Sequence, residues 1–171
     1  PTDTANMVSD MVIKLSLGSA LFTDKVLRAG VLGVQVVHPM MMGTPKVEHS
    51  GIESNVKPFV LHPTITGHSV SLSDMTLQFS PKIGKTQRVV AILNECNSSS
   101  GNPHAYTIKA PPQNGITDES VTETDSITFS LVGVEPGDYL LRVQVDGAQS
   151  PLETDPDPDN PMYVKPRIVI P

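Results

Sequence analysis

Apolar residues along much of the chain recur at every second position, which is the spacing of a half-buried β-strand. In the run 126–132 the apolar residues Ile127, Phe129 and Leu131 alternate with polar ones. In the run 139–145 the side chains of Tyr139, Leu141, Val143 and Val145 fall on one face in the same way. Each pattern predicts a strand with one face in a core and the other in solvent.

Further short runs are rich in β-branched residues and are bounded by turn residues, which is typical of strands. They lie at 31–37, 56–62, 70–72, 75–79, 87–93, 105–110 and 167–170. Pro58 places the strand at 56–62 at a sheet edge or a bulge, because proline has no N–H to donate. Asp146-Gly147 is a tight hairpin signal. The run 11–17 allows a strand or one end of a helix, and Gly18 makes the helix the weaker alternative.

About eight to ten strands with short turns and no persuasive helix predict an all-β fold, an antiparallel immunoglobulin-like β-sandwich with long loop insertions. No change of composition marks an internal linker. We therefore expect residues 29–171 to form a single elaborated sandwich, and residues 1–28 to be an N-terminal segment that contributes a strand. Phe79, Phe129 and Tyr139 are the large residues expected in its core. Residues 40–55 are expected to form a long loop or insertion, and residues 97–102 a loop tip.

Composition excludes several classes of function. The chain has 171 residues and a formal net charge of −6, which argues against binding to nucleic acid or to an anionic membrane. It has no tryptophan, so few aromatic faces are available on which bases or sugars would stack. A single cysteine, Cys96, excludes an intramolecular disulfide and a cysteine-based zinc site. The apolar runs are too short to cross a bilayer, and no membrane insertion is expected.

A resemblance to known proteins begins in the stretch 127–152. It holds an alternating strand, a Pro-Gly turn before a tyrosine, and a second strand that ends in Val-Asp-Gly and is followed by Ser-Pro-Leu. This stretch resembles the end of an immunoglobulin-like domain of the IPT/TIG type. Longer matching phrases lie at 29–39, 51–61, 85–90, 93–95 and 166–171.

Together these phrases resemble the C-terminal region of bacterial proteins of one uncharacterised family. The N-terminal domain of those proteins belongs to the uncharacterised tail-terminator or cap family of phage-tail-like contractile injection systems of the Photorhabdus virulence cassette type. The resemblance covers about residues 29–171 and supplies no catalytic residues. It implies a non-enzymatic structural or protein-interaction module of such a particle, with no cofactor.

The resemblance also implies partners and a location. Its expected partners are tail-tube or sheath proteins, and a homo-oligomer is an open alternative. The protein would be cytoplasmic during assembly and part of a released particle afterwards. The rival function is a free-standing surface- or carbohydrate-binding β-sandwich module, against which the missing tryptophan counts.

The residues themselves offer one candidate interface. Met40, Met41 and Met42 form a run of flexible apolar side chains, and methionines are common at adaptable binding surfaces. We expect them to face a partner protein. The alternative is that two of the three fold back onto the core.

A second candidate is a calcium site at Asp155, Asp157 and Asp159, which alternate along the chain as in a calcium loop. Prolines fill the gaps, however, and alternating Asp-Pro favours an extended strap with solvated carboxylates. The five histidines show no short ligand spacing. No G-x-S-x-G elbow is present, and nothing near Cys96 in the sequence would activate its thiol, so no enzyme is predicted.

Overall fold

The computed structural model describes residues 7–8, 13–14, 27–96, 101–157, 159 and 161–171. Almost every regular element in this part of the chain is a β-strand, and every paired strand is antiparallel. The all-β antiparallel class expected from the alternating pattern is therefore confirmed. No helix in the described residues is long and apolar enough to cross a membrane.

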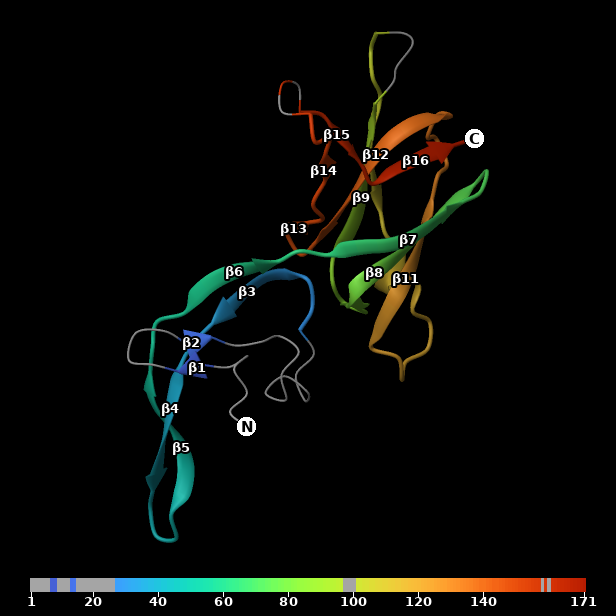
Figure 1. Cartoon of the computed structure of the whole chain (residues 1–171). Coiled ribbons are helices and arrows are strands. Elements are labelled where there is room, and N and C mark those ends of the chain that lie inside the picture. Colours follow the sequence, from blue (N-terminus) through green and yellow to red (C-terminus); the bar gives the residue numbers. More distant parts are fainter. Residues whose placement is uncertain (1–6, 9–12, 15–26, 97–100, 158, 160) are drawn as a thin grey trace, which may run out of the picture.

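Two sheets form the sandwich that fills one end of the molecule (Figure 1). The first sheet has the order β11-β8-β7 and is built from β7 (Thr64–Val70), β8 (Asp74–Gly84) and β11 (Glu123–Ser130). The second sheet has the order β10-β9-β12, and β12 also pairs with two short strands. Its members are β9 (Val89–Glu95), β10 (Ala105–Lys109), β12 (Gly137–Val145), β13 (Ala148–Gln149) and β16 (Arg167–Ile170).

The core lies between these two sheets. Ile127 and Phe129 of β11 are at most 1% exposed, and the alternate residues of β12 from Tyr139 to Val145 are fully buried. Phe79 is also in the core, so the three large residues expected there are confirmed. In β11 the residues between Ile127, Phe129 and the turn are serine and threonine, so this strand has one buried and one polar face, as the sequence pattern indicated.

The strand order is that of immunoglobulin-like sandwiches, and a tyrosine supports the comparison. The hydroxyl of Tyr139, near the start of β12, donates a 2.9 Å hydrogen bond to the carbonyl oxygen of Glu135, four residues upstream. A tyrosine bonded back across the turn before this strand is the tyrosine corner of such sandwiches. The Asp146-Gly147 turn between β12 and β13 is a hairpin, as expected, and both residues have positive φ.

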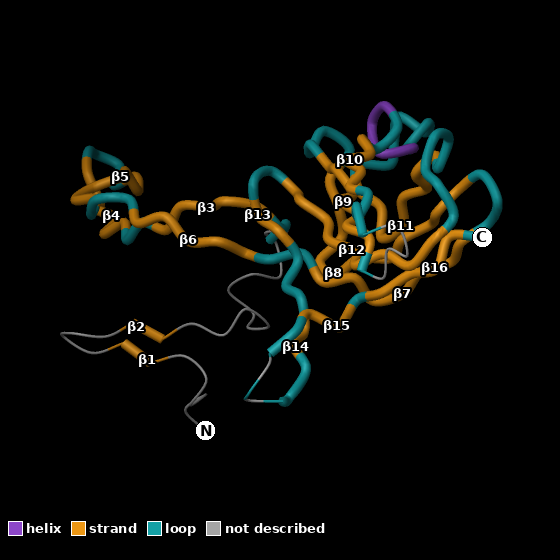
Figure 2. The backbone as a smooth tube through the Cα atoms, turned by 90° about the horizontal axis from the view of Figure 1, so that it is seen from above, coloured by secondary structure: helices purple, strands orange, loops and turns teal. Residues whose placement is uncertain are grey.

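Residues 30–61 lie outside both sheets and form a long two-stranded structure, here called the ribbon (Figure 2). Its root is the ladder of β3 (Gly30–Val34) with β6 (Lys57–Leu61), and its outer half pairs β4 (Val37–Met42) with β5 (Val47–Glu53). In Figure 1 the strands β3 and β6 lead away from the sandwich toward β4 and β5.

The prediction of a loop at 40–55 is wrong for most of that stretch. Strands β4 and β5 occupy it, joined by a turn at 43–46. The outer ladder pairs Met42 with Val47 and His38 with Ile52, so apolar residues gain cross-strand neighbours that a one-dimensional pattern does not display. Pro58 lies in β6, which pairs only with β3 among the described residues, so its expected edge position is confirmed.

The remaining elements are short. They are β1 (Met7–Val8), β2 (Ile13–Lys14), the 3-10 turn η2 (Pro112–Gly115), β14 (Glu153–Thr154) and β15 (Tyr163–Lys165). Strands β1 and β2 pair with each other and fall within the expected N-terminal segment 1–28, but most of that segment lies outside the described residues. Residues 97–100 of the expected loop tip also lie outside them.

Candidate interaction surface

The β3 strand of the ribbon is anchored to two turns of the sandwich. The side-chain amide of Gln87 donates to the carbonyl oxygen of Ala29 over 2.7 Å and to Oδ2 of Asp146 over 2.9 Å. The other carboxylate oxygen of Asp146 accepts the backbone N–H of Arg88. Ala29 itself is fully buried in the core cluster. These contacts join the β8–β9 and β12–β13 turns to the point where the ribbon leaves the sandwich.

The β6 strand is anchored separately, just beyond its end. Nδ1 of His62 lies 2.7 Å from the carbonyl oxygen of Gln149, and because a carbonyl only accepts, the imidazole donates. Gly30 permits the close approach on the opposite strand: its φ is +146°, and an added Cβ would lie 3.4 Å from the Cβ of Asp146. Because β3 and β6 are both hydrogen-bonded to the sandwich near their ends, the ribbon projects in a defined direction.

Side chains join the two ladders of the ribbon where the β3–β6 pairing ends and the β4–β5 pairing begins. Gln35 donates to the carboxylate of Glu53 over 3.1 Å and to the carbonyl oxygen of Ser54 over 2.8 Å. The hydroxyl of Ser54 accepts the N–H of Val36, and the Ser54 N–H donates to the Val36 carbonyl. The ribbon is therefore one continuous hairpin from its root to its turn.

The surface of the ribbon is unusually apolar. Eleven of its Val, Ile and Met residues are exposed, from 44% for Val37 to 72% for Ile52. They are Val31, Val34, Val36, Val37, Met40, Met41, Met42, Val47, Ile52, Val56 and Val60. Soluble proteins seldom leave so many large apolar residues in one exposed patch, and such patches mark sites of contact.

Apolar side chains lie on both faces of the ribbon. Val31 pairs with Val60, and the next pair along, Leu32 with Phe59, must point to the opposite face because strand residues alternate. Strands with apolar residues on both faces are typical of sheets that are covered on both sides. A two-stranded ribbon on its own is at best marginally stable in water.

The three methionines lie in the outer half of the ribbon, on β4. Met40, Met41 and Met42 are 45%, 59% and 53% exposed. The alternative in which two of them fold back onto the core is therefore wrong. Their partner-facing role stays a prediction, but the structure adds eight further apolar residues around them. Four of these, Val31, Val34, Val36 and Val37, lie in the run 31–37, whose β-branched residues had predicted a strand.

The aspartates expected in a strap lie between β14 and β15. The N–H of Asp157 donates to the carboxylate of Asp155 over 3.1 Å, and the N–H of Asp159 donates to that of Asp157 over 3.0 Å. All three residues are exposed. Among the described residues, no group of three His, Cys, Asp or Glu side chains is arranged to hold a metal ion. His38 lies in the outer ribbon and His62 at its root.

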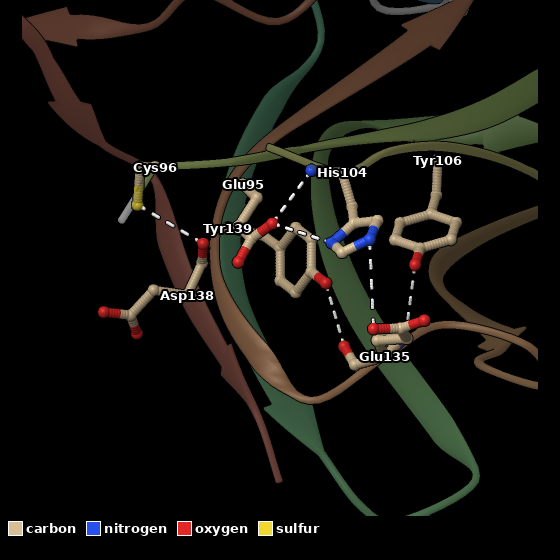
Figure 3. A network of polar contacts seen from close by, with 7 residues as sticks. All are labelled: Glu95, Cys96, His104, Tyr106, Glu135, Asp138 and Tyr139. Carbon is tan, nitrogen blue, oxygen red and sulfur yellow. Dashed lines mark hydrogen bonds and ion pairs between the residues drawn. The ribbon is translucent and has the colours of Figure 1, made fainter. Parts of the chain in front are cut away.

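A network of polar contacts surrounds the tyrosine corner on the sandwich (Figure 3). One carboxylate oxygen of Glu95 accepts both the backbone N–H and Nδ1 of His104, at 2.8 and 2.9 Å. Nε2 of His104 lies 3.9 Å from the carboxylate of Glu135. The backbone N–H of Glu135 donates a 3.4 Å hydrogen bond to the hydroxyl oxygen of Tyr106. The contacts tie the ends of β9 and β10 to the turn that precedes β12.

The same contacts shift two pKa values. The backbone N–H of His104, with help from its side chain, lowers the pKa of the Glu95 carboxyl. Burial, followed by the neighbouring Tyr106, raises the pKa of Tyr139 to about 12. Cys96, next to Glu95, donates its thiol to the carbonyl oxygen of Asp138 over 3.4 Å. Because these groups bond chiefly to backbone atoms of neighbouring strands and turns, we interpret the network as structural.

The free energy of unfolding is expected to fall as the pH rises above 10, because the pKa of Tyr139 is raised in the folded state. Its folded pKa lies above the usual value of 10, so between pH 10 and 12 the folded state holds a proton that the unfolded state loses. The stabilisation is full below pH 10 and is lost as the pH rises through 12, an effect on the order of 3 kcal/mol for a difference of about two pKa units. Urea denaturation from pH 8 to 12 measures it. In Tyr139→Phe this part of the slope should be absent, and an unchanged slope would contradict the assignment.

These observations define the class of the protein: an immunoglobulin-like β-sandwich from which an anchored apolar ribbon projects. Residues 55–169 match a family described as a domain of unknown function (DUF8756), and the chain belongs to that family. The match runs from the end of the outer ribbon through the whole sandwich. No curated protein and no solved structure shows a significant similarity to the chain.

Proposed function

We propose that this protein is a non-enzymatic structural module that joins a larger protein assembly through its ribbon. The observation that carries the proposal is an apolar surface on both faces of an element whose root is fixed to a folded sandwich. Side chains that filled the core of a monomer would lie between its sheets, whereas the strands that carry these exposed side chains lead away from the sheets (Figure 2).

The size of the exposed surface fits a stable contact between proteins. With their size and exposure, the eleven apolar residues together present on the order of 1,000 Å² to solvent, where one partner in a standard interface contributes about 800 Å². Their flexible methionines suit a contact that must adapt to the shape of another surface.

The backbone of the ribbon offers a second means of attachment. In each of its ladders, both strands pair with one neighbour only among the described residues, which leaves an outer edge on either side. Such edges accept a further strand from another chain, which adds backbone hydrogen bonds to the apolar contact. The two features together favour insertion of the ribbon into a neighbouring protein.

The kind of assembly is proposed from the resemblance that covers residues 29–171. It points to a phage-tail-like contractile injection particle, with a tail-tube or sheath protein as the neighbour that receives the ribbon. The rival carbohydrate-binding function stays a prediction. A groove of about 450 Å³ beside η2 is lined by polar and aliphatic residues, among them Lys85, Arg88 and Lys109, and by no aromatic ring on which a sugar would stack.

Co-sedimentation tests this proposal. The natural full-length protein is tagged in its host, large particles are pelleted, and the pellet is probed for the tag and for tube and sheath proteins. We expect the tag in the pellet, and we expect Met41→Glu to reduce it about tenfold, because that change places a charge in the apolar contact. Val132→Glu is the control, since Val132 is 87% exposed on the sandwich. A tag found only in the soluble fraction contradicts the proposal.

A further inference from the structure

We infer that the outer face of the second sheet is a docking surface for an extended acidic segment of a partner protein. The surface begins in the groove beside η2 and runs across β9 toward β12. Because it lies on the sandwich and not on the ribbon, it is a second contact that is independent of the proposed one. Its charge, its elongated shape and its apolar floor point to this occupant.

The groove beside η2 is basic although the chain is acidic. Lys85, Arg88 and Lys109 line it, and no aspartate or glutamate of the described residues does, while the whole chain has a formal charge of −6. Lys85 donates to the backbone carbonyl oxygen of Asp118 over 3.0 Å. Neither Arg88 nor Lys109 forms an ion pair with a carboxylate in the part of the chain that the structure describes. Cations left without carboxylates in an acidic chain favour an anionic partner.

The backbone of Arg88 is fixed by the turn on the other side of the sheet. Its N–H donates to Oδ1 of Asp146 over 2.9 Å, and its carbonyl oxygen accepts the N–H of Asp146 over 3.0 Å. The second carboxylate oxygen of Asp146 accepts the side-chain amide of Gln87. Asp146 therefore bonds to the backbone of Arg88 and leaves its guanidinium exposed. A cation on a fixed backbone is ready to bind before its partner arrives.

The groove continues past Val90 onto the outer face of the sheet. Val90 points outward, because strand residues alternate and both of its neighbours belong to the core cluster between the sheets. It pairs with Lys109 on one side and with Gln144 on the other. A second hollow of about 150 Å³ shares Arg88 and Val90 with the groove. The two hollows form one elongated depression, which suits an extended chain better than a compact ion.

A further cation lies on the same face, along β12. Arg142 is two residues from Gln144, so its side chain points to the same side of the sheet. Its guanidinium donates to Oδ1 of Asn94 over 2.9 Å and to Oε1 of Gln149 over 3.4 Å. Both acceptors are neutral amides, so they orient the guanidinium without cancelling its charge. A segment that crosses β9 from Lys109 to Arg142 therefore meets a cation on both neighbouring strands.

A protein segment fits this surface better than a nucleic acid does. Bases stack on aromatic rings, and among the described residues no Phe or Tyr lines either hollow. Valine, alanine and proline line the groove instead, and they offer apolar contacts to the side chains of a peptide. The carboxylates of an acidic segment are the groups that the cations would bind.

Fluorescence anisotropy tests the inference on the purified 171-residue chain. The probe is a fluorescein-labelled peptide of about ten residues in which glutamate alternates with valine, and the same peptide with glutamine in place of glutamate is its control. We expect saturable binding of the acidic peptide with a Kd below about 1 mM at low salt. Raising the ionic strength from about 0.05 to 0.5 M should weaken binding about tenfold, because salt screens exposed charges.

Charge reversal locates the contact. Lys109→Glu and Arg88→Glu should each weaken binding of the acidic peptide about tenfold, because each replaces an attraction by a repulsion. Lys57→Glu is the matched control, since Lys57 is exposed on β6 of the ribbon and its reversal changes the net charge by the same amount. Circular dichroism verifies that all three variants are folded.

Each outcome has a distinct meaning. No saturable binding of the acidic peptide overturns the docking surface, and equal losses in Lys57→Glu and Lys109→Glu overturn the groove as its location. An oligodeoxythymidine of about ten nucleotides that binds more tightly than the peptide overturns the protein segment as occupant. Met41→Glu, which tests the proposed function, should leave peptide binding unchanged, so the two proposals can fail separately.

Discussion

Replacing Leu141 with alanine is expected to lower the free energy of unfolding by about 3–5 kcal/mol. Leu141 is fully buried in the middle of β12 and pairs with Leu93 of β9. It belongs to a core cluster with members from both sheets, among them Met75 and Phe129, and such a close-packed interior relaxes only partly around a cavity. The substitution removes the free energy gained by transferring the leucine side chain from water into the core, and it also removes packing contacts.

The chain supplies a control with the same substitution. Leu72 is 86% exposed, and Leu72→Ala is expected to change stability by less than about 0.5 kcal/mol. Urea denaturation of the wild type and both variants measures the difference, with the slope of the transition checked for each. Equal effects at Leu141 and Leu72 would mean that the sandwich core is not where the structure places it.

Asn114→Ala is expected to destabilise the protein by about 2–4 kcal/mol. The side chain of Asn114 is 5% exposed, and its Nδ2 donates 2.9 Å hydrogen bonds to the carbonyl oxygens of Gly84 and Gln87. Alanine leaves both carbonyls without that donor. Asn114 also has a φ of +56°, a conformation that asparagine tolerates better than alanine does.

Gln113 is the matched control for this position. It is the adjacent residue, has a φ of +54° and is exposed, so Gln113→Ala carries the same backbone strain without the two buried hydrogen bonds. Its expected effect is within about 1 kcal/mol. Thermal unfolding followed by circular dichroism compares the two variants. If they lose similar stability, the backbone conformation and not the amide contacts explains the role of Asn114.

The sandwich was predictable because its strands show their burial in the sequence. Ile127 and Phe129 face the core at every second position, and Tyr139 begins a second run of the same kind. The outer half of the ribbon was not predictable in this way, although strands were expected at 31–37 and 56–62, where β3 and β6 lie. Apolar residues do not recur at regular intervals in residues 40–55, because a strand that is exposed on both faces needs no alternation of apolar and polar side chains. Proline and glycine in the same stretch suggested a loop.

The candidate interface was found only in part. The three methionines were identified by residue type, but Ile52 and Val60 join them only through cross-strand pairing, which the sequence does not display. Asn114 was missed for a similar reason: Asn-Gly after two prolines indicates a turn, whereas its bonds to Gly84 and Gln87 depend on contacts across about 30 residues of chain.

The way the ribbon joins the sandwich determines how the protein would carry a mechanical load. Strand β6 continues into β7 through His62 and Pro63, so tension along the ribbon pulls β7 lengthwise. Because the hydrogen bonds of antiparallel strands lie across the strand direction, such a pull shears the bonds of β7 to β8 together instead of opening them one at a time. The C-terminal strand β16 belongs to the other sheet, so force passing from ribbon to C-terminus must cross the packed core. A β-sandwich resists extension best when all hydrogen bonds between two strands must break together and the strands are also packed against a core.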